Sequence, residues 1–256
     1  VKILFQEMRL KSTVCRPSSA EEIKQKMLEP APPKPKVNYS TERTLDQWVY
    51  DSLFNDMTRG VLLPGEKLVE TVLCEKFQVS RTVVRQALHR LAELKIVNIV
   101  PNKGASVAAP TPQEAIEVFE VRRGVEAAII RLLSQKIGPI DLQRLQERLE
   151  AEQKALNEHD LPRWAILAGG FHLALAQITG NKLFQKLLLE LLTQCTLIVA
   201  LYETPGNTDC EHAEHVRLVE LLALQDTEGA IKIMDQHLLN LQNRLNFNKV
   251  QIQTVP

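Results

Sequence analysis

The stretch VSRTVVRQAL, residues 79–88, places Arg81 and Arg85 in the first two turns of a predicted helix. The N-terminal end of a helix carries partial positive charge, so each cation there is unfavourable by about 0.3–1 kcal/mol. Arginine can bind guanine or a phosphate through two parallel hydrogen bonds. The two arginines alone fit either an anionic partner such as DNA or two solvated charges on a surface helix; the basic segment and the hairpin described below favour DNA.

Positive charge is concentrated around these arginines, although the 256-residue chain has a formal net charge of zero. Residues 79–104 contain one acidic residue, Glu93, against five basic residues. A concentrated basic segment in a neutral protein indicates a specific anionic partner rather than non-specific binding to anions. The five basic residues are Arg81, Arg85, Arg90, Lys95 and Lys103.

Three of the six histidines, His172, His215 and His237, each lie beside the apolar stripe of a different predicted helix. Three such side chains can converge inside a helical bundle, where neutral imidazole binds Zn, Ni, Cu or Fe. A single histidine at such a position more often belongs to the core. The spacing alone therefore leaves a metal site and three core histidines about equally favoured.

The elements that position the arginines are predicted within a domain at residues 41–109. Apolar residues recur at helical spacing over 45–57, a short helix follows over about 69–77, and Ser80 is the expected N-cap of a third helix. The intervening LPGEKL is predicted to be a turn, and IVNIV and ASVAA, joined by PNKG, to be a hairpin. Three short helices and a hairpin form a winged helix-turn-helix, whose recognition helix enters the DNA major groove.

The rest of the chain makes the fold mainly α. Residues 110–248 are predicted to form an antiparallel bundle of six to seven helices, with Asp160, Asn181 and Asp226 as caps. Residues 1–40 are expected to be a poorly ordered extension with a proline-rich linker, and 249–256 a tail. The predicted helices span about 112–136, 140–158, 161–178, 182–203, 210–225 and 228–247.

Composition favours a cytoplasmic protein without a membrane span. The four cysteines are widely scattered, which suits reduced thiols better than a disulfide framework. The most apolar stretch, LFQKLLLELLTQCTLIVALY, contains Lys186 and Glu190 and is therefore a poor membrane helix. Neither a G-x-S-x-G motif nor a P-loop is present, so acyl or nucleotide chemistry has no support.

The segment LCEKFQVSRTVVRQALHRLAELKIVNIVPNKGASV, residues 73–107, resembles the DNA-binding domain of the GntR family of bacterial transcription regulators. The family pattern is a V-S-R-T-x-V-R-x-A-L helix followed by a wing that ends in G-x-x-V. By this resemblance, Lys103 and Gly104 place the wing tip in the minor groove. The resemblance also implies that DNA is contacted by Ser80, Arg81, Thr82 and Arg85.

The stretches VFEVRRGVEAAI, FHLALAQITGN and EHVRLVELLALQDTEGAIKIMDQHL resemble the FCD domain, the effector-binding half of the FadR-type branch of that family. In many FCD domains an Asp and three His hold a divalent metal, and a small carboxylate completes the coordination. His172, His215 and His237 match the three histidines, but Ala168 stands at the Asp position. The resemblance thus implies a zinc or nickel site that has lost its anionic protein ligand.

Arg122 matches an arginine that points toward the ligand cavity in related domains. An ion pair with Glu126, four residues along the helix, is an equally favoured alternative.

The resemblance implies a homodimeric regulator, by family habit a repressor, that binds a two-fold DNA operator and responds to a small organic acid. Two alternatives stay open. The C-terminal domain can be a dimerisation module without a ligand. Less favoured is a metal-dependent enzyme fused to a DNA-binding domain, because no candidate general base lies within one turn of His172.

Overall fold

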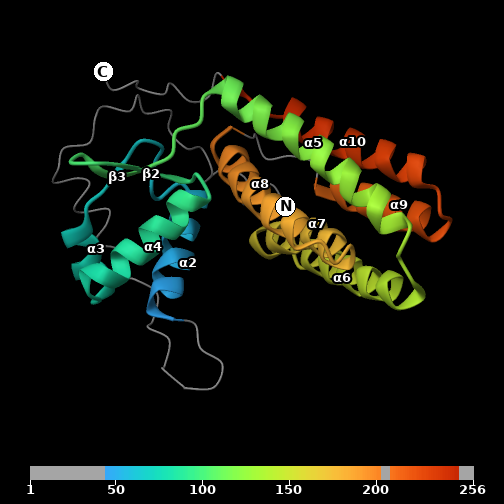
Figure 1. Ribbon diagram of the computed structural model, residues 1–256, viewed down its shortest axis with the longest axis horizontal. Helices are drawn as coiled ribbons and strands as arrows, with labels where there is room; N and C mark the ends of the chain where they lie inside the picture. Colours follow the sequence, from blue (N-terminus) through green and yellow to red (C-terminus); the bar gives the residue numbers. More distant parts are fainter. Residues whose placement is uncertain (1–43, 203–207, 248–256) are drawn as a thin grey trace, which may run out of the picture.

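The computed structural model describes residues 44–202 and 208–247. It has an N-terminal half of helices and a small sheet, followed by a wholly helical C-terminal half (Figure 1). The predicted extension at 1–40 and tail at 249–256 lie outside the described residues.

The N-terminal half has the predicted winged helix-turn-helix order. Ser80 is the N-cap of α4, since its backbone is extended and its Oγ accepts a hydrogen bond from the Val83 N–H at 3.4 Å. The elements of this half are α2 (Leu45–Thr58), β1 (Lys67–Leu68), α3 (Glu70–Phe77), α4 (Arg81–Glu93), β2 (Val97–Val100) and β3 (Gly104–Val107).

Strand β1 was not predicted, and its segment LPGEKL is only partly a turn. Gly65 has the left-handed backbone (φ 76°) expected at such a turn, but Lys67 and Leu68 then pair antiparallel with β3. The wing is therefore a three-stranded sheet of order β1-β3-β2. Two residues are too few to display the period-two pattern by which a strand is recognised in sequence.

The tip of the wing is a tight turn between β2 and β3. The Lys103 N–H donates to the Val100 carbonyl at 3.0 Å, and Asn102 is left-handed with φ 63°. Gly104 follows with φ 86°, a backbone conformation that glycine adopts without steric cost. This geometry leaves the Lys103 side chain exposed at the end of the hairpin.

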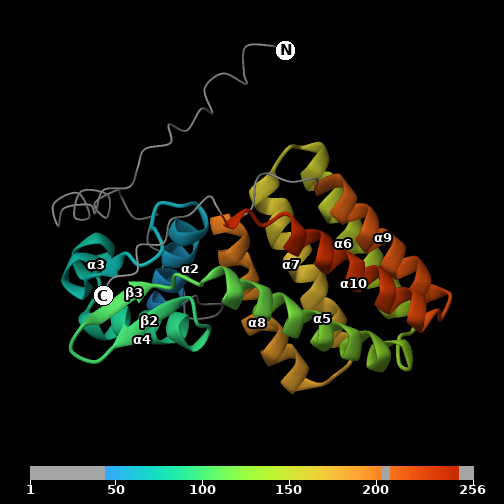
Figure 2. The same cartoon turned by 90° about the horizontal axis from the view of Figure 1, so that it is seen from above.

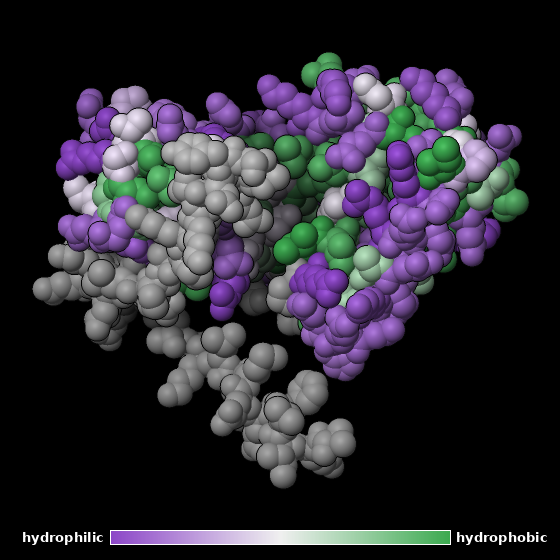
Figure 3. Space-filling view, turned by 90° about the horizontal axis from the view of Figure 1, so that it is seen from below, coloured by the Kyte–Doolittle hydropathy of each residue, from purple (hydrophilic) through white to green (hydrophobic). Residues whose placement is uncertain are grey.

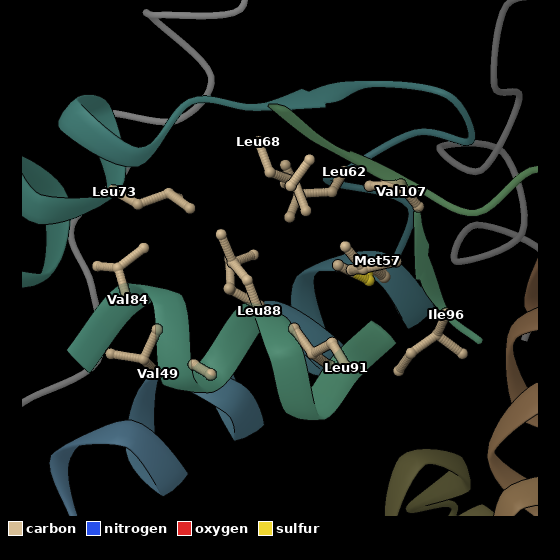
Figure 4. Packing of buried hydrophobic residues seen from close by; sticks show 14 of the residues in the cluster. Val49, Met57, Leu62, Leu68, Leu73, Val84, Leu88, Leu91, Ile96 and Val107 are labelled. Atoms are coloured by element: carbon tan, nitrogen blue, oxygen red, sulfur yellow. The ribbon is translucent and has the colours of Figure 1, made fainter. Parts of the chain in front are cut away.

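The core of this half forms where α4 crosses α2 beneath the sheet (Figure 4). Leu53 of α2 is 0 % exposed, and Trp48 meets Phe77 of α3 edge to face at 5.3 Å. The helical spacing of apolar residues correctly predicted this inward face. Its other buried members include Val49, Met57, Leu73, Val84, Ala87, Leu88 and Leu91.

The C-terminal half contains six helices within the described residues. Asp160, Asn181 and Asp226 cap α7, α8 and α10 as predicted, because each accepts a hydrogen bond from a backbone N–H of the first turn. The helices are α5 (Pro112–Ser134), α6 (Pro139–Asn157), α7 (Leu161–Ile178), α8 (Lys182–Tyr202), α9 (Thr208–Ala223) and α10 (Thr227–Asn243).

Helix α8 joins the two halves, as the views in Figures 1 and 2 show. Leu197 of α8 is buried in the N-terminal core. Lys95, just after α4, forms an ion pair with Glu190 of α8 at 3.2 Å. The Tyr202 hydroxyl donates to the carbonyl of Pro110, in the connection between the halves, at 2.5 Å.

Among the described residues, α8 alone is long and apolar enough to cross a membrane by length and composition. Its buried residues pack instead on protein, since α8 contacts α2, α5 and α7. The face in Figure 3 shows mainly hydrophilic side chains on the helical half, with separate hydrophobic patches between them. Protein contacts thus account for the buried apolar residues of α8.

Burial predicts that Leu53→Ala lowers the free energy of unfolding by about 2–5 kcal/mol, because it leaves a cavity between α2 and α4. Urea denaturation followed by circular dichroism measures the loss. Leu224→Ala is the matched control, because Leu224 is 73 % exposed; that variant is expected to stay within about 0.5 kcal/mol of wild type. Equal losses in both variants would contradict the assignment of this core.

Candidate nucleic-acid interface and metal centre

The outward face of α4 and the tip of the wing carry the residues expected to contact DNA. Ser80, Arg81, Thr82, Arg85, Lys103 and Gly104 are all exposed. The buried face of α4 packs on α2, which turns Arg81, Thr82 and Arg85 to solvent. Gln86 and His89 are also exposed on this helix and follow Thr82 by four and seven residues.

Three of the five basic residues in segment 79–104 already form ion pairs with carboxylates. Arg85 Nε lies 2.9 Å from Glu70 Oε1, and Arg90 Nη1 lies 2.8 Å from Asp46 Oδ2. Lys95 pairs with Glu190, as described above. Within residues 44–202 and 208–247, Arg81 and Lys103 form no ion pair. Three of the five basic residues thus have carboxylate partners outside the segment, and binding of the segment to an anionic partner stays a prediction.

The ion pair of Arg85 is compatible with a second partner. The Arg85 side chain is 59 % exposed, and an exposed ion pair contributes little to stability because solvent screens it. The pair with Glu70 also holds the guanidinium beside the N-terminal turns of α4.

The three predicted histidines come together in the core of the helical half. His172 lies on α7, His215 on α9 and His237 on α10, and each offers one nitrogen within 4.8 Å of the other two. All three are at most 3 % exposed. The spacing of their rings, with centroids 4.8–5.3 Å apart, fits three ligands around one ion.

The Nδ1 atom of each ring is hydrogen-bonded to a glutamate carboxylate. A carboxylate oxygen only accepts hydrogen bonds, so each Nδ1–H donates and each Nε2 keeps its lone pair. This arrangement orients a histidine toward a metal. The Nε2 of His215 is buried and has no hydrogen-bond partner among the described residues. The pairs are His172 with Glu126 at 2.6 Å, His215 with Glu152 at 3.0 Å and His237 with Glu214 at 2.7 Å.

Electrostatics keep two of the rings neutral at physiological pH. Burial lowers the pKa of His172 to about 4 and that of His237 to about 3. Burial alone would raise the pKa of Glu126, but His172 and Arg122 outweigh it and lower that pKa to about 2. Neutral imidazole is the form that binds a metal ion.

Arg122 forms the ion pair that its spacing allowed. Its Nε lies 2.7 Å from Glu126 Oε1, and the side chains are 5 % and 2 % exposed. Because Glu126 also binds His172, Arg122 belongs to the same buried network. Contact of Arg122 with an effector stays a prediction.

Position 168, where the resemblance places an aspartate, is apolar in its surroundings. Ala168 is 8 % exposed and shares a buried cluster with Ala155 and Trp164. The neighbouring Gly169 and Gly170 do not distort the backbone, since α7 runs unbroken through them. A Cβ atom would meet no close contact at Gly169, and nothing in the structure explains these two glycines.

Sequence reasoning missed the three carboxylates that bind the histidines. Glu214 directly precedes His215, and Glu126 was considered only as a partner of Arg122. Glu152 comes from α6, more than 60 residues before its histidine, and no motif singled it out. Only the packing of α6 against α9 brings that pair together.

Both halves of the chain match known protein families. Residues 45–107 match the family described as "Bacterial regulatory proteins, gntR family", and residues 117–240 match the FCD domain. Among solved structures, Escherichia coli McbR/YncC superposes with a TM-score of 0.65 at 23 % identity, over 79 % of this chain and 99 % of that one. A putative GntR regulator from Rhodococcus sp. RHA1 gives 0.64 at 24 % identity, over 77 % and 95 %.

Curated relatives are transcription regulators. The repressor GlaR of Escherichia coli K12 is 28 % identical over 208 residues, which cover 74 % of this chain and 90 % of GlaR. LutR of Bacillus subtilis 168 is 29 % identical over 73 % of this chain and 94 % of its own. An Agrobacterium vitis regulator is 32 % identical over 48 % of this chain and 74 % of its own. The chain therefore belongs to the GntR family of DNA-binding transcription regulators, in the branch that carries an FCD domain.

Proposed function

We propose that this regulator acts as a cytoplasmic homodimeric repressor whose helical domain binds a divalent metal and a small carboxylate effector. The domains run over residues 41–109, for DNA binding, and 110–248, for effector binding and dimerisation. The observation that carries the effector half is the convergence of three buried histidines whose Nδ1 atoms all bind carboxylates. Repression is supported by the printed name of the relative GlaR.

The DNA-contacting role of α4 rests on its exposed face. Arg81 and Arg85 can each bind a guanine edge or a phosphate, and Ser80 and Thr82 can donate to phosphate oxygens. Lys103 and Gly104, at the tip of the wing, are suited to the narrower minor groove next to that helix.

The metal site is proposed to hold zinc or nickel. His172, His215 and His237 would be its protein ligands, because imidazole nitrogen suits these ions. A bound divalent ion would supply positive charge for a carboxylate in the positions the protein leaves open. Arg122 would add positive charge to the same buried region.

A second copy of the chain is proposed to cover an apolar face of α5 and α8. Val121 of α5 is 52 % exposed, and Leu183 and Leu187 of α8 are 72 % and 36 % exposed. The two helices contact each other, so these side chains lie on adjoining elements. A two-fold dimer doubles the number of base contacts and matches a two-fold operator.

Effector binding would change the affinity for DNA only if the two DNA-binding states bind the effector differently. The ion pair of Lys95 with Glu190 and the bond from Tyr202 to Pro110 connect the two halves. These contacts supply a physical route for such coupling.

Arg85→Ala is expected to weaken operator binding by about 1–3 kcal/mol and to relax sequence preference at one base position. Fluorescence anisotropy with the operator and single-base variants measures both effects. Arg217→Ala is the matched control, because Arg217 is an exposed, ion-paired arginine on α9. Unchanged affinity of a folded Arg85→Ala protein would exclude this base contact.

His215→Ala is expected to weaken zinc binding by at least tenfold, because it removes one of three nitrogen ligands. Calorimetric titration of full-length protein, purified without nickel affinity, measures the change. His159→Ala is the control, since His159 is exposed and lies outside the cluster. If wild type and both variants bind zinc equally, the three histidines are core residues.

Leu187→Lys is expected to convert the dimer to a monomer at micromolar concentration, because it places a charge within the proposed interface. Sedimentation velocity distinguishes the two states. Ile166→Lys changes another exposed apolar residue, on α7, and is expected to leave the dimer intact. A monomeric wild-type protein, with and without operator, would refute the proposed assembly.

A further inference from the structure

Glu152 is a buried carboxylate with an unusual set of partners. Its side chain is 0 % exposed on α6. One oxygen, Oε2, accepts from His215 Nδ1 at 3.0 Å and from His212 Nδ1 at 3.1 Å. The other oxygen, Oε1, is buried without any hydrogen-bond partner among the described residues.

The two other carboxylates of the cluster are better compensated. Glu126 forms an ion pair with Arg122, and Glu214 is 17 % exposed and accepts a hydrogen bond from Asn240. In the part of the chain that the structure describes, neither lysine nor arginine forms an ion pair with Glu152. A buried carboxylate without a cation is unfavourable, so a positive charge close to Glu152 would stabilise this arrangement.

That charge is expected on the far side of the His215 ring. Glu152 binds Nδ1, and the opposite nitrogen, Nε2, is the buried atom that lacks a partner. A chain of carboxylate, imidazole and metal is a recurring arrangement in which the carboxylate fixes the ring and strengthens its nitrogen as a ligand. Ala168 contributes no charge to this site.

We infer that Glu152 is the positioning residue for the metal, holding His215 toward the ion and supplying the anionic charge that position 168 lacks. This inference rests on the proposed three-histidine metal site. The compensating carboxylate then lies on α6 and contacts the ligand His215, whereas an aspartate at position 168 of α7 would contact the ion directly.

Zinc titration of the full-length protein tests the assignment. Glu152→Gln keeps the shape of the side chain and an acceptor oxygen but removes the charge, and is expected to weaken zinc binding by about 10- to 100-fold. Glu150→Gln, an exposed glutamate two residues away, is the matched control and should bind zinc like wild type. Adding Ala168→Asp to Glu152→Gln should restore much of the lost affinity, because it returns a carboxylate one helical turn from His172.

Thermal unfolding gives a second readout that a merely structural role would not produce. In EDTA, Glu152→Gln should melt at a higher temperature than wild type, because an uncompensated buried charge has been removed. In excess zinc the order should reverse. Loss of folding of Glu152→Gln in EDTA would overturn the inference, since the carboxylate would then stabilise the metal-free fold.

The outcomes separate this inference from the metal site itself. If zinc binding is weakened by His215→Ala but unaffected by Glu152→Gln, the metal site stands and the role of Glu152 is refuted. His212 would then be the group that compensates Glu152. If wild type binds no zinc, both the metal site and the role of Glu152 are refuted.

Discussion

The packing of the helical half depends on the pairing of three imidazoles with three carboxylates in a largely apolar interior. Unpaired, each of these groups would cost several kcal/mol to bury. Pairing each Nδ1 with a glutamate oxygen satisfies that N–H donor and fixes every ring in one orientation. The glutamates come from α5, α6 and α9, and the histidines from α7, α9 and α10. Five of the six helices are thus held in register by a polar network rather than by apolar packing alone.

The sequence was sufficient to predict most of the fold, because long amphipathic helices with capping residues leave clear periodic signals. The apolar faces of α2 and α4 and the caps at Asp160 and Asp226 are confirmed. Strand β1 was not predicted, because its two residues acquire their conformation only by pairing with β3. Local pattern carries no information about such a partner.

The candidate sites were predictable only in part, for a related reason. The histidines stood out because each lies in a helical apolar stripe, and family resemblance grouped them. Their carboxylate partners depend on which helices pack together, and Glu152 meets His215 only through the contact of α6 with α9. The partners of the basic segment were not predicted, because ion pairs such as Arg90 with Asp46 join residues far apart in sequence. Counting charges along a chain cannot reveal these pairings.

Helix α8 contributes to three hydrophobic clusters at once. Leu188 lies in the main cluster of the helical half, Cys195 in a second cluster, and Leu197 in the core of the winged helix-turn-helix. One helix thus packs into the cores of both halves of the molecule. The two halves should consequently unfold in one cooperative transition. Separating them would leave a cavity in the core of the DNA-binding half, at the place that Leu197 fills. Replacing the DNA-binding half with that of another protein would therefore require a surface on α8 that fits the new core.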